Sequence, residues 1–203
     1  MSERNVELHR NGTIAMSQRN LKDMTLAELW QLFPIVLVSY NPDWSKWAGE
    51  EILRLGELLE DYGPIINHIG STAISGIWAK PIIDILVEIN PDTDWQRIKE
   101  EMETAGYICM AVSETRMSFN KGYTPHGYAD KVFHIHIHAI GDNDEIYFRD
   151  YLNCHPAVAY EYEALKFSLL PQYRNDRDGY TEAKSVFVQN ITHLAKSDSK
   201  THQ

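Results

Sequence analysis

Short apolar runs alternate along the chain with longer stretches in which apolar residues recur every three or four positions. The short runs are rich in Ile and Val and predict strands over 35–39, 65–69, 82–89, 107–112, 116–119 and 131–140. The longer stretches predict helices over 26–33, 43–59, 92–105, 143–152, 156–170 and 178–195. Helices and strands in this order predict an α/β (α+β) fold, with a mixed, twisted β-sheet flanked by helices.

The length of 203 residues favours a single domain. We expect that domain over residues 23–195, between a flexible N-terminal tail at 1–22 and a flexible C-terminal tail at 196–203, because both ends are polar and lack periodicity. A third polar stretch, 120–130, contains glycine, proline and tyrosine and predicts a flexible loop able to cover a site.

The composition is that of an ordinary globular protein, with 43% hydrophobic and 24% charged residues. The formal net charge of −10 argues against general nucleic-acid binding, because neutralising phosphates requires clustered Lys and Arg. No apolar run approaches the about 20 residues that a membrane span needs. Since the chain starts with polar residues and its cysteines, Cys109 and Cys154, have no metal-binding spacing, we expect a cytoplasmic protein with reduced thiols. This pattern predicts no oligomeric state.

The first stretch with chemical character is the turn that follows the predicted strand 65–69. Gly70 permits close backbone approach to a ligand, and Ser71 or Thr72 is able to cap a following helix. Free N–H groups and the helix dipole favour anions at such a turn, so we expect Gly70, Ser71 and Thr72 to bind a phosphate or a nucleotide. The side chains expected to donate to the same anion are Lys80, Arg116, Lys121 and Lys184.

A second chemical signal comes from Asp84, which lies in an apolar run where a lone carboxylate is costly to bury without a partner or a metal. Strict alternation in the last predicted strand places His134, His136 and His138 on one face. Residues two apart on a strand are separated by about 6.5–7 Å, so a single ion can bind only two of these histidines, together with a ligand from a neighbouring strand. We therefore expect the two strands to be neighbours and Asp84, His134 and His136 to bind a divalent metal.

The chemistry of this set depends on whether a metal is bound. One carboxylate with imidazoles suits Mn²⁺, Zn²⁺ or Ni²⁺ better than Mg²⁺, which prefers oxygen ligands. We expect Asp84, His136 and His68 to be the catalytic residues, with a histidine as general base if no metal binds. The alternative is a solvated strand face on which the histidines occur by chance.

Two longer strings, 68–73 (His-Ile-Gly-Ser-Thr-Ala) and 80–85 (Lys-Pro-Ile-Ile-Asp-Ile), resemble the GrpB family of small bacterial proteins. The resemblance covers roughly 34–195 and includes the segments 40–44, 134–136, 148–152 and 180–184. It implies a nucleotidyltransferase-like fold, in which the Gly-Ser turn holds nucleotide phosphates and strand carboxylates hold a divalent metal. Lys166 and Lys184 are predicted surface lysines of their helices, and only the resemblance makes them candidate ligands.

One position departs from the nucleotidyltransferase pattern. The metal-binding strand of those enzymes carries two carboxylates two residues apart, whereas the second position here is Leu86. Glu88 lies about 13 Å from Asp84 along the strand and cannot serve the same ion. Three functions therefore stay open: transfer of a nucleotidyl or phosphoryl group to a small acceptor, metal-dependent hydrolysis, and nucleotide or phosphate binding without catalysis. Each of them takes a small-molecule or nucleotide partner.

Overall fold

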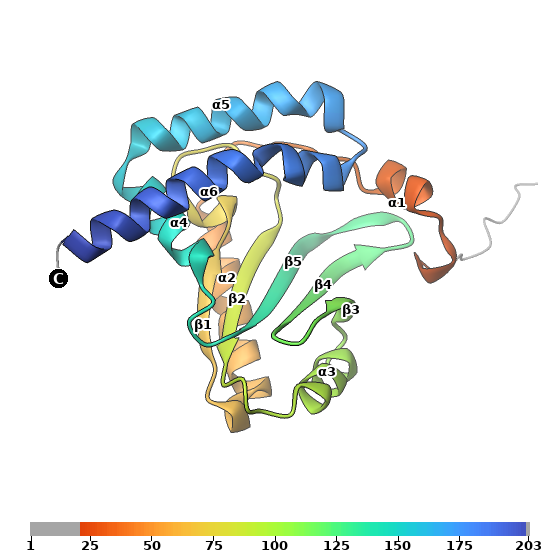
Figure 1. Cartoon of the computed structure of the whole chain (residues 1–203). Coiled ribbons are helices and arrows are strands. Elements are labelled where there is room, and N and C mark those ends of the chain that lie inside the picture. Colours follow the sequence, from red (N-terminus) through yellow and green to blue (C-terminus); the bar gives the residue numbers. More distant parts are fainter. Residues whose placement is uncertain (1–20, 202–203) are drawn as a thin grey trace, which may run out of the picture.

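The computed structural model describes residues 21–201 and contains a five-stranded sheet in the order β1-β2-β5-β4-β3 (Figure 1). Its strands are β1 (Ile65–Ile69), β2 (Ile83–Ile89), β3 (Ile108–Val112), β4 (Arg116–Thr124) and β5 (Gly127–Ala139). β2 and β5 run parallel and the other neighbouring pairs run antiparallel, which confirms the predicted mixed sheet. At 35–39 the structure has an isolated bridge between Val38 and Ala79 instead of the predicted strand.

Six α-helices accompany the sheet in the described part of the chain. They are α1 (Leu26–Leu32), α2 (Asp43–Leu58), α3 (Trp95–Thr104), α4 (Asp144–Cys154), α5 (Pro156–Tyr173) and α6 (Arg177–Thr201). Short 3₁₀ helices occur at η1 (Leu21–Asp23), η2 (Glu60–Tyr62) and η3 (Ser71–Ala73). Within residues 21–201, none of the helices has the length and apolar character that crossing a membrane requires.

The structure tests the two predicted tails to different extents. Of the N-terminal tail expected at 1–22, residues 1–20 lie outside the described residues, and the last two positions belong to η1. At the other end, α6 continues to Thr201, past the predicted boundary at 196. No glycine or proline follows Gly179 to end this helix, and Lys196 forms an ion pair with Asp144 of α4. The expected C-terminal tail is therefore largely helical.

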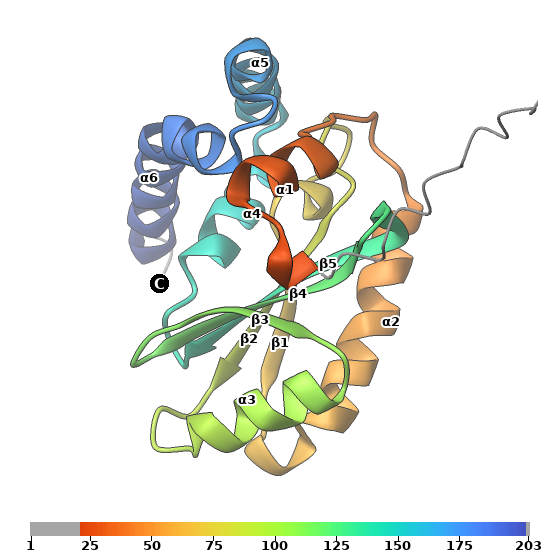
Figure 2. The same cartoon turned by 90° about the vertical axis from the view of Figure 1, so that its right-hand side faces the viewer.

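The sheet separates two layers of helices (Figure 2). α2 and α3 cover one face, where Ile83, Ile85 and Val87 of β2 are fully buried. α4, α5 and α6 cover the other face and pack on one another around Phe148 and Tyr162. Because side chains alternate along a strand, Asp84 and Leu86, which lie between these three residues, face the second layer. The polar residues of the sheet therefore lie beneath α4–α6.

The predicted loop at 120–130 is wrong, because these residues extend β4 and β5 into a long hairpin. Tyr123 pairs with Tyr128 across the hairpin, and both rings contact Phe33 with centroid distances of 4.8 and 5.1 Å. A bulge at Gly122 precedes this pair. The φ of Gly122 is +89°, and a Cβ added to it would lie 3.0 Å from the Cα of Val132. The glycine that suggested a loop therefore allows a bulge within a strand, and the tyrosines belong to an aromatic cluster.

Candidate functional site

The Asp84 carboxylate lies between two imidazole rings of the neighbouring strand. Its Oδ1 is 3.3 Å from Nδ1 of His134 and 3.4 Å from Nε2 of His136. The expectation that β2 and β5 are neighbours with Asp84 on the histidine face is confirmed, since Asp84 pairs in register with His134. Burial acts to raise the pKa of Asp84, but the hydrogen bonds and charges of the two imidazoles outweigh it and hold that pKa below its ordinary value.

These three side chains are arranged as a possible metal site. Asp84, His134 and His136 each offer one ligand atom, and all three atoms lie within 4.8 Å of one another. Ligand atoms about 2 Å from a common ion lie at most about 4 Å apart. The separations of 3.3 and 3.4 Å between Oδ1 and the two ring nitrogens satisfy this limit, so the carboxylate and each ring are spaced for one divalent ion. One carboxylate oxygen with two ring nitrogens favours Zn²⁺, Mn²⁺ or Ni²⁺ over Mg²⁺.

The second ring nitrogen of His134 is held by a chain of hydrogen bonds that the sequence did not reveal. Nε2 of His134 lies 2.7 Å from the hydroxyl oxygen of Tyr123, and Nη2 of Arg177 donates to that same oxygen at 2.7 Å. Burial raises the pKa of Tyr123, so the phenol stays protonated. A partner on the second nitrogen fixes the orientation of a metal-binding imidazole, and Tyr123 with Arg177 supplies that partner.

The turn after β1 approaches the same carboxylate closely. Gly70 has φ +72° and ψ −172°, a conformation that is essentially restricted to glycine. A Cβ at this position would lie 2.9 Å from the Cβ of Asp84 and closer still to its Oδ2. Gly70 and Ser71 both border the cavity beside Asp84. The structure therefore brings the predicted anion-binding turn and the predicted metal ligand together.

Thr72 and His68 are linked to each other instead of facing the cavity. The Thr72 hydroxyl donates to the carbonyl of Ile82 at 3.3 Å and lies 2.9 Å from Nε2 of His68. His68 pairs with Ile85, so it belongs to the α2 face of the sheet. Burial lowers the pKa of His68 to about 4; the charge of Asp84 acts to raise this pKa and the charge of Arg149 acts to lower it. This geometry argues against the expected catalytic role of His68 and against Thr72 as a ligand-binding group; both residues support the turn.

Four cationic side chains border the cavity near Asp84: Lys80, Lys166, Arg177 and Lys184. Lys166, expected on the surface, is only 2% exposed and donates to the carbonyl of Trp78. Burial and the charge of Lys184 lower the pKa values of Lys80 and Lys166, each to about 7. Lys184 lies over the Tyr180 ring, 4.5 Å from its centroid. A chain with net charge −10 thus concentrates positive charge around one carboxylate.

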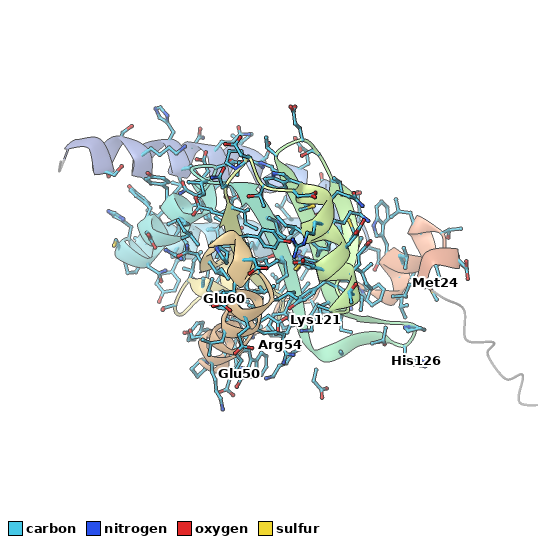
Figure 3. The ribbon with its side chains drawn as sticks, turned by 90° about the horizontal axis from the view of Figure 1, so that it is seen from below. Met24, Glu50, Arg54, Glu60, Lys121 and His126 are labelled. Carbon is cyan, nitrogen blue, oxygen red and sulfur yellow. The ribbon has the colours of Figure 1, made fainter. Side chains whose placement is uncertain are left out.

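Two of the expected anion donors lie elsewhere. Lys121 shares the side of β4 that faces α2, where its Nζ lies 2.6 Å from Glu51 and close to Arg54 (Figure 3). Arg116 makes a bidentate pair with Asp142 at 2.6 Å and sits opposite His138 in the register. Their charges are already neutralised by these partners, so we correct the expectation that Arg116 and Lys121 bind the anion at the Gly70 turn.

A cavity of about 760 Å³ connects the Asp84–histidine set, the Gly70 turn and the four cationic side chains. Its floor includes Ser118 and Asn120 of β4, which pair in register with His136 and His134. Neither polar residue was a predicted site residue, although strand alternation in β4 would have placed both on the histidine face. The opposite end of the cavity is apolar and is formed by η1, α1 and β3.

Comparisons with known proteins identify bacterial relatives. The family model described as "GrpB protein" matches residues 34–194. Glutamate-rich protein GrpB of Alkalihalophilus pseudofirmus is 35% identical over 164 residues, which cover 77% of this chain and 93% of that protein. UPF0157 protein PA4798 of Pseudomonas aeruginosa is also 35% identical, over 160 residues that cover 77% of this chain and 66% of that protein.

A solved structure shows the same fold. The crystal structure of conserved protein GrpB from Enterococcus faecalis has a TM-score of 0.68 and 28% identity, over 81% of this chain and 99% of that chain. A structure of the Cid1 poly(U) polymerase bound to MgATP has a TM-score of 0.45 and 11% identity, over 70% of this chain and 44% of that chain. A likeness of the latter size does not define an activity.

Proposed function

Since the chain belongs to the GrpB family, we propose that it transfers a nucleotidyl or phosphoryl group from a nucleotide to a small acceptor, with a divalent metal at Asp84, His134 and His136. The supporting observation is that one cavity borders the metal-ligand set, the Gly70 turn and four cationic side chains. Phosphate oxygens are recognised by cations, by backbone N–H groups and by metal ions, so this combination suits a phosphate-bearing ligand.

The side chains around the cavity have separate roles in this proposal. A divalent ion bound there would act as a Lewis acid on a phosphoryl oxygen. Lys80, Lys184 and Arg177 bind and orient the phosphates, and positive charge at these positions offsets charge that develops on them. Gly70 lets the turn approach the carboxylate without steric conflict.

His136 has a different role if the protein works without a metal. Its Nε2 faces Asp84 at 3.4 Å, and this hydrogen bond orients the ring. Nδ1 is then available to take the proton of an acceptor hydroxyl as the acceptor oxygen attacks phosphorus. Metal coordination through Nε2 and proton acceptance at Nδ1 exclude each other, because a metal-bound neutral imidazole carries its proton on the other nitrogen.

A second candidate function is binding of a nucleotide or phosphate without turnover. It is favoured by Leu86, which is 0% exposed and takes the place of a second carboxylate. Glu88 does not replace it, because its Oε1 accepts hydrogen bonds from Gly141 and Asn143 at 2.9 and 3.0 Å. A site with one carboxylate binds phosphate through its cations but has fewer ligands with which to hold the metals of phosphoryl transfer.

Calorimetry combined with product analysis tests the two functions. ATP and inorganic phosphate are titrated in the presence of Mn²⁺, and release of pyrophosphate, ADP and phosphate is measured with and without small acceptors. We expect Lys184→Met to weaken nucleotide binding and Lys121→Met, a lysine on the α2 face, to leave it unchanged. Nucleotidyl transfer releases pyrophosphate and phosphoryl transfer releases ADP without free phosphate. Acceptor-dependent release of either product that is lost in Asp84→Asn supports transfer, and acceptor-independent phosphate release indicates hydrolysis. Binding without release supports the second function, and failure of both ligands to bind contradicts both.

A further inference from the structure

The short helix α1 presents apolar side chains to the cavity instead of packing them into a core. None of its residues, Leu26–Leu32, is buried. Leu29 and Trp30 are half-buried, Leu26 is 56% exposed, and all three border the cavity. A helix with an apolar side normally covers that side with other parts of the protein. In the part of the chain that the structure describes, that side borders the cavity.

The strand β3 supplies a second apolar surface to the same space. Ile108 and Met110 border the cavity, and they are 36% and 58% exposed. β3 is the edge strand of the sheet, next to β4. Two apolar surfaces, one on α1 and one on β3, therefore share a cavity with the cationic side chains near Asp84.

The floor of the cavity changes in polarity along one row of paired residues. Asp84 of β2 pairs with His134 of β5, His134 pairs with Asn120 of β4, and Asn120 pairs with Ile108 of β3. The row thus runs from a carboxylate through an imidazole and an amide to an aliphatic side chain, and all four residues border the cavity. Four adjacent strands span about 14 Å, because neighbouring strands lie roughly 4.8 Å apart.

Helix α1 is held in place over the apolar part of this row. A capping box between Thr25 and Glu28 begins the helix. Phe33, directly after α1, packs on Tyr123 and Tyr128 of the hairpin, and the backbone N–H of Ile35 donates to the carbonyl of Arg174 at 2.8 Å. Figure 2 shows α1 beside the start of α6 and above the β4–β5 hairpin. The apolar surface is therefore preformed.

We propose that the cavity binds a phosphate-bearing ligand with an apolar, ring-containing body, with its phosphate near Lys80 and Lys184 and its ring between α1 and β3. This inference rests on the proposed function and names the substrate class. The amide of Asn120 and the hydroxyl of Ser118 face the middle of the ligand, where a neutral polar group fits. Inorganic phosphate and compact sugar phosphates leave the apolar surfaces uncovered and bind more weakly.

Two phosphonates that resist hydrolysis test this inference by calorimetry with Mn²⁺ present. Methylphosphonate carries only the anionic group, whereas 1-naphthylmethylphosphonate adds an aromatic body. We expect the naphthyl compound to bind at least about tenfold more tightly, which corresponds to the transfer of one ring out of water. Leu29→Asn and Met110→Asn should each reduce this ratio by at least about threefold and leave methylphosphonate affinity unchanged.

The matched control is Val112→Asn, on the same strand. Val112 is 56% exposed and is not among the described residues that border the cavity, so its substitution should preserve the affinity ratio. Equal affinity for the two phosphonates, or an unchanged ratio in both Leu29→Asn and Met110→Asn, overturns the inference while phosphate binding itself stands. Binding of neither phosphonate overturns both the inference and the proposed function.

Discussion

Replacing Gly70 by alanine tests whether the turn and the carboxylate form one site. The backbone conformation of Gly70, φ +72° and ψ −172°, costs a residue with a side chain about 1–3 kcal/mol. The added Cβ would also lie 2.9 Å from the Cβ of Asp84, and overpacking of this kind costs roughly 1–3 kcal/mol. We expect a total loss of about 3 kcal/mol of stability, or about 6–12 °C in Tm for a chain of this size.

The same substitution should weaken metal binding, because the new methyl group displaces the Asp84 carboxylate from the two imidazoles. We expect Mn²⁺ affinity to fall by at least about tenfold, the size of effect seen when a metal ligand loses its orientation. Gly76→Ala is the matched control: its φ is +78°, but apart from its chain neighbours no described residue comes within 4 Å of the added Cβ. It should cost only about 1 kcal/mol and leave Mn²⁺ affinity unchanged. Urea unfolding and calorimetry measure both quantities, and similar values for the two variants would refute the reasoning.

Three other substitutions test separate parts of the account. Tyr123→Phe removes the hydrogen bond to the metal-site imidazole and should lower Mn²⁺ affinity about 10-fold by calorimetry, whereas Tyr128→Phe should not. The pKa of Lys166 falls from 10.5 in the unfolded chain to about 7 in the folded protein. Between these two pH values the unfolded chain binds more protons, so the free energy of unfolding rises with pH. Lys166→Met should reduce that rise, as measured by urea unfolding at pH 7 and pH 9. Lys121→Met removes the nearer of the two cations beside the buried Glu51, leaving the exposed Arg54 at 3.5 Å, and should cost about 2 kcal/mol by urea unfolding. A loss of stability no larger than that caused by the same substitution at an exposed lysine would contradict the pairing of Lys121 with Glu51.

Strand alternation accounts for the part of the site that the sequence predicted. An acidic residue in one apolar run and alternating histidines in another place Asp84, His134 and His136 on definite faces, and the structure brings those faces together. The same argument applied to β4 would have placed Lys121 with Met117 and Phe119, away from the histidines. Charge alone makes Lys121 a candidate anion donor, but its position in the strand directs its side chain to the opposite face of the sheet.

Other features depend on contacts between distant segments, which periodicity does not reveal. Tyr123 contacts His134 only because a glycine bulge lets 120–130 form a hairpin, and Arg177 reaches it from the start of α6. Lys166 is buried because α5 packs against the segment that carries Trp78, which lies far away in sequence. Charged and aromatic residues of this kind look like surface or loop residues until the tertiary structure is known.

Calorimetric titration of Mn²⁺, Zn²⁺ and Mg²⁺ measures the central claim most directly. One oxygen and two nitrogen ligands should bind Mn²⁺ and Zn²⁺ at micromolar concentration where Mg²⁺ binds weakly, and affinity should fall as the pH drops because protons compete for the imidazoles. Asp84→Asn and His136→Ala should each abolish binding in a folded protein. His138→Ala should retain it, since the Nδ1 of His138 already bonds the carbonyl of Asp142 at 2.8 Å. Mg²⁺ binding as tight as Mn²⁺, or Mn²⁺ binding unaffected by His136→Ala, would contradict a metal site formed by Asp84 together with the two histidines.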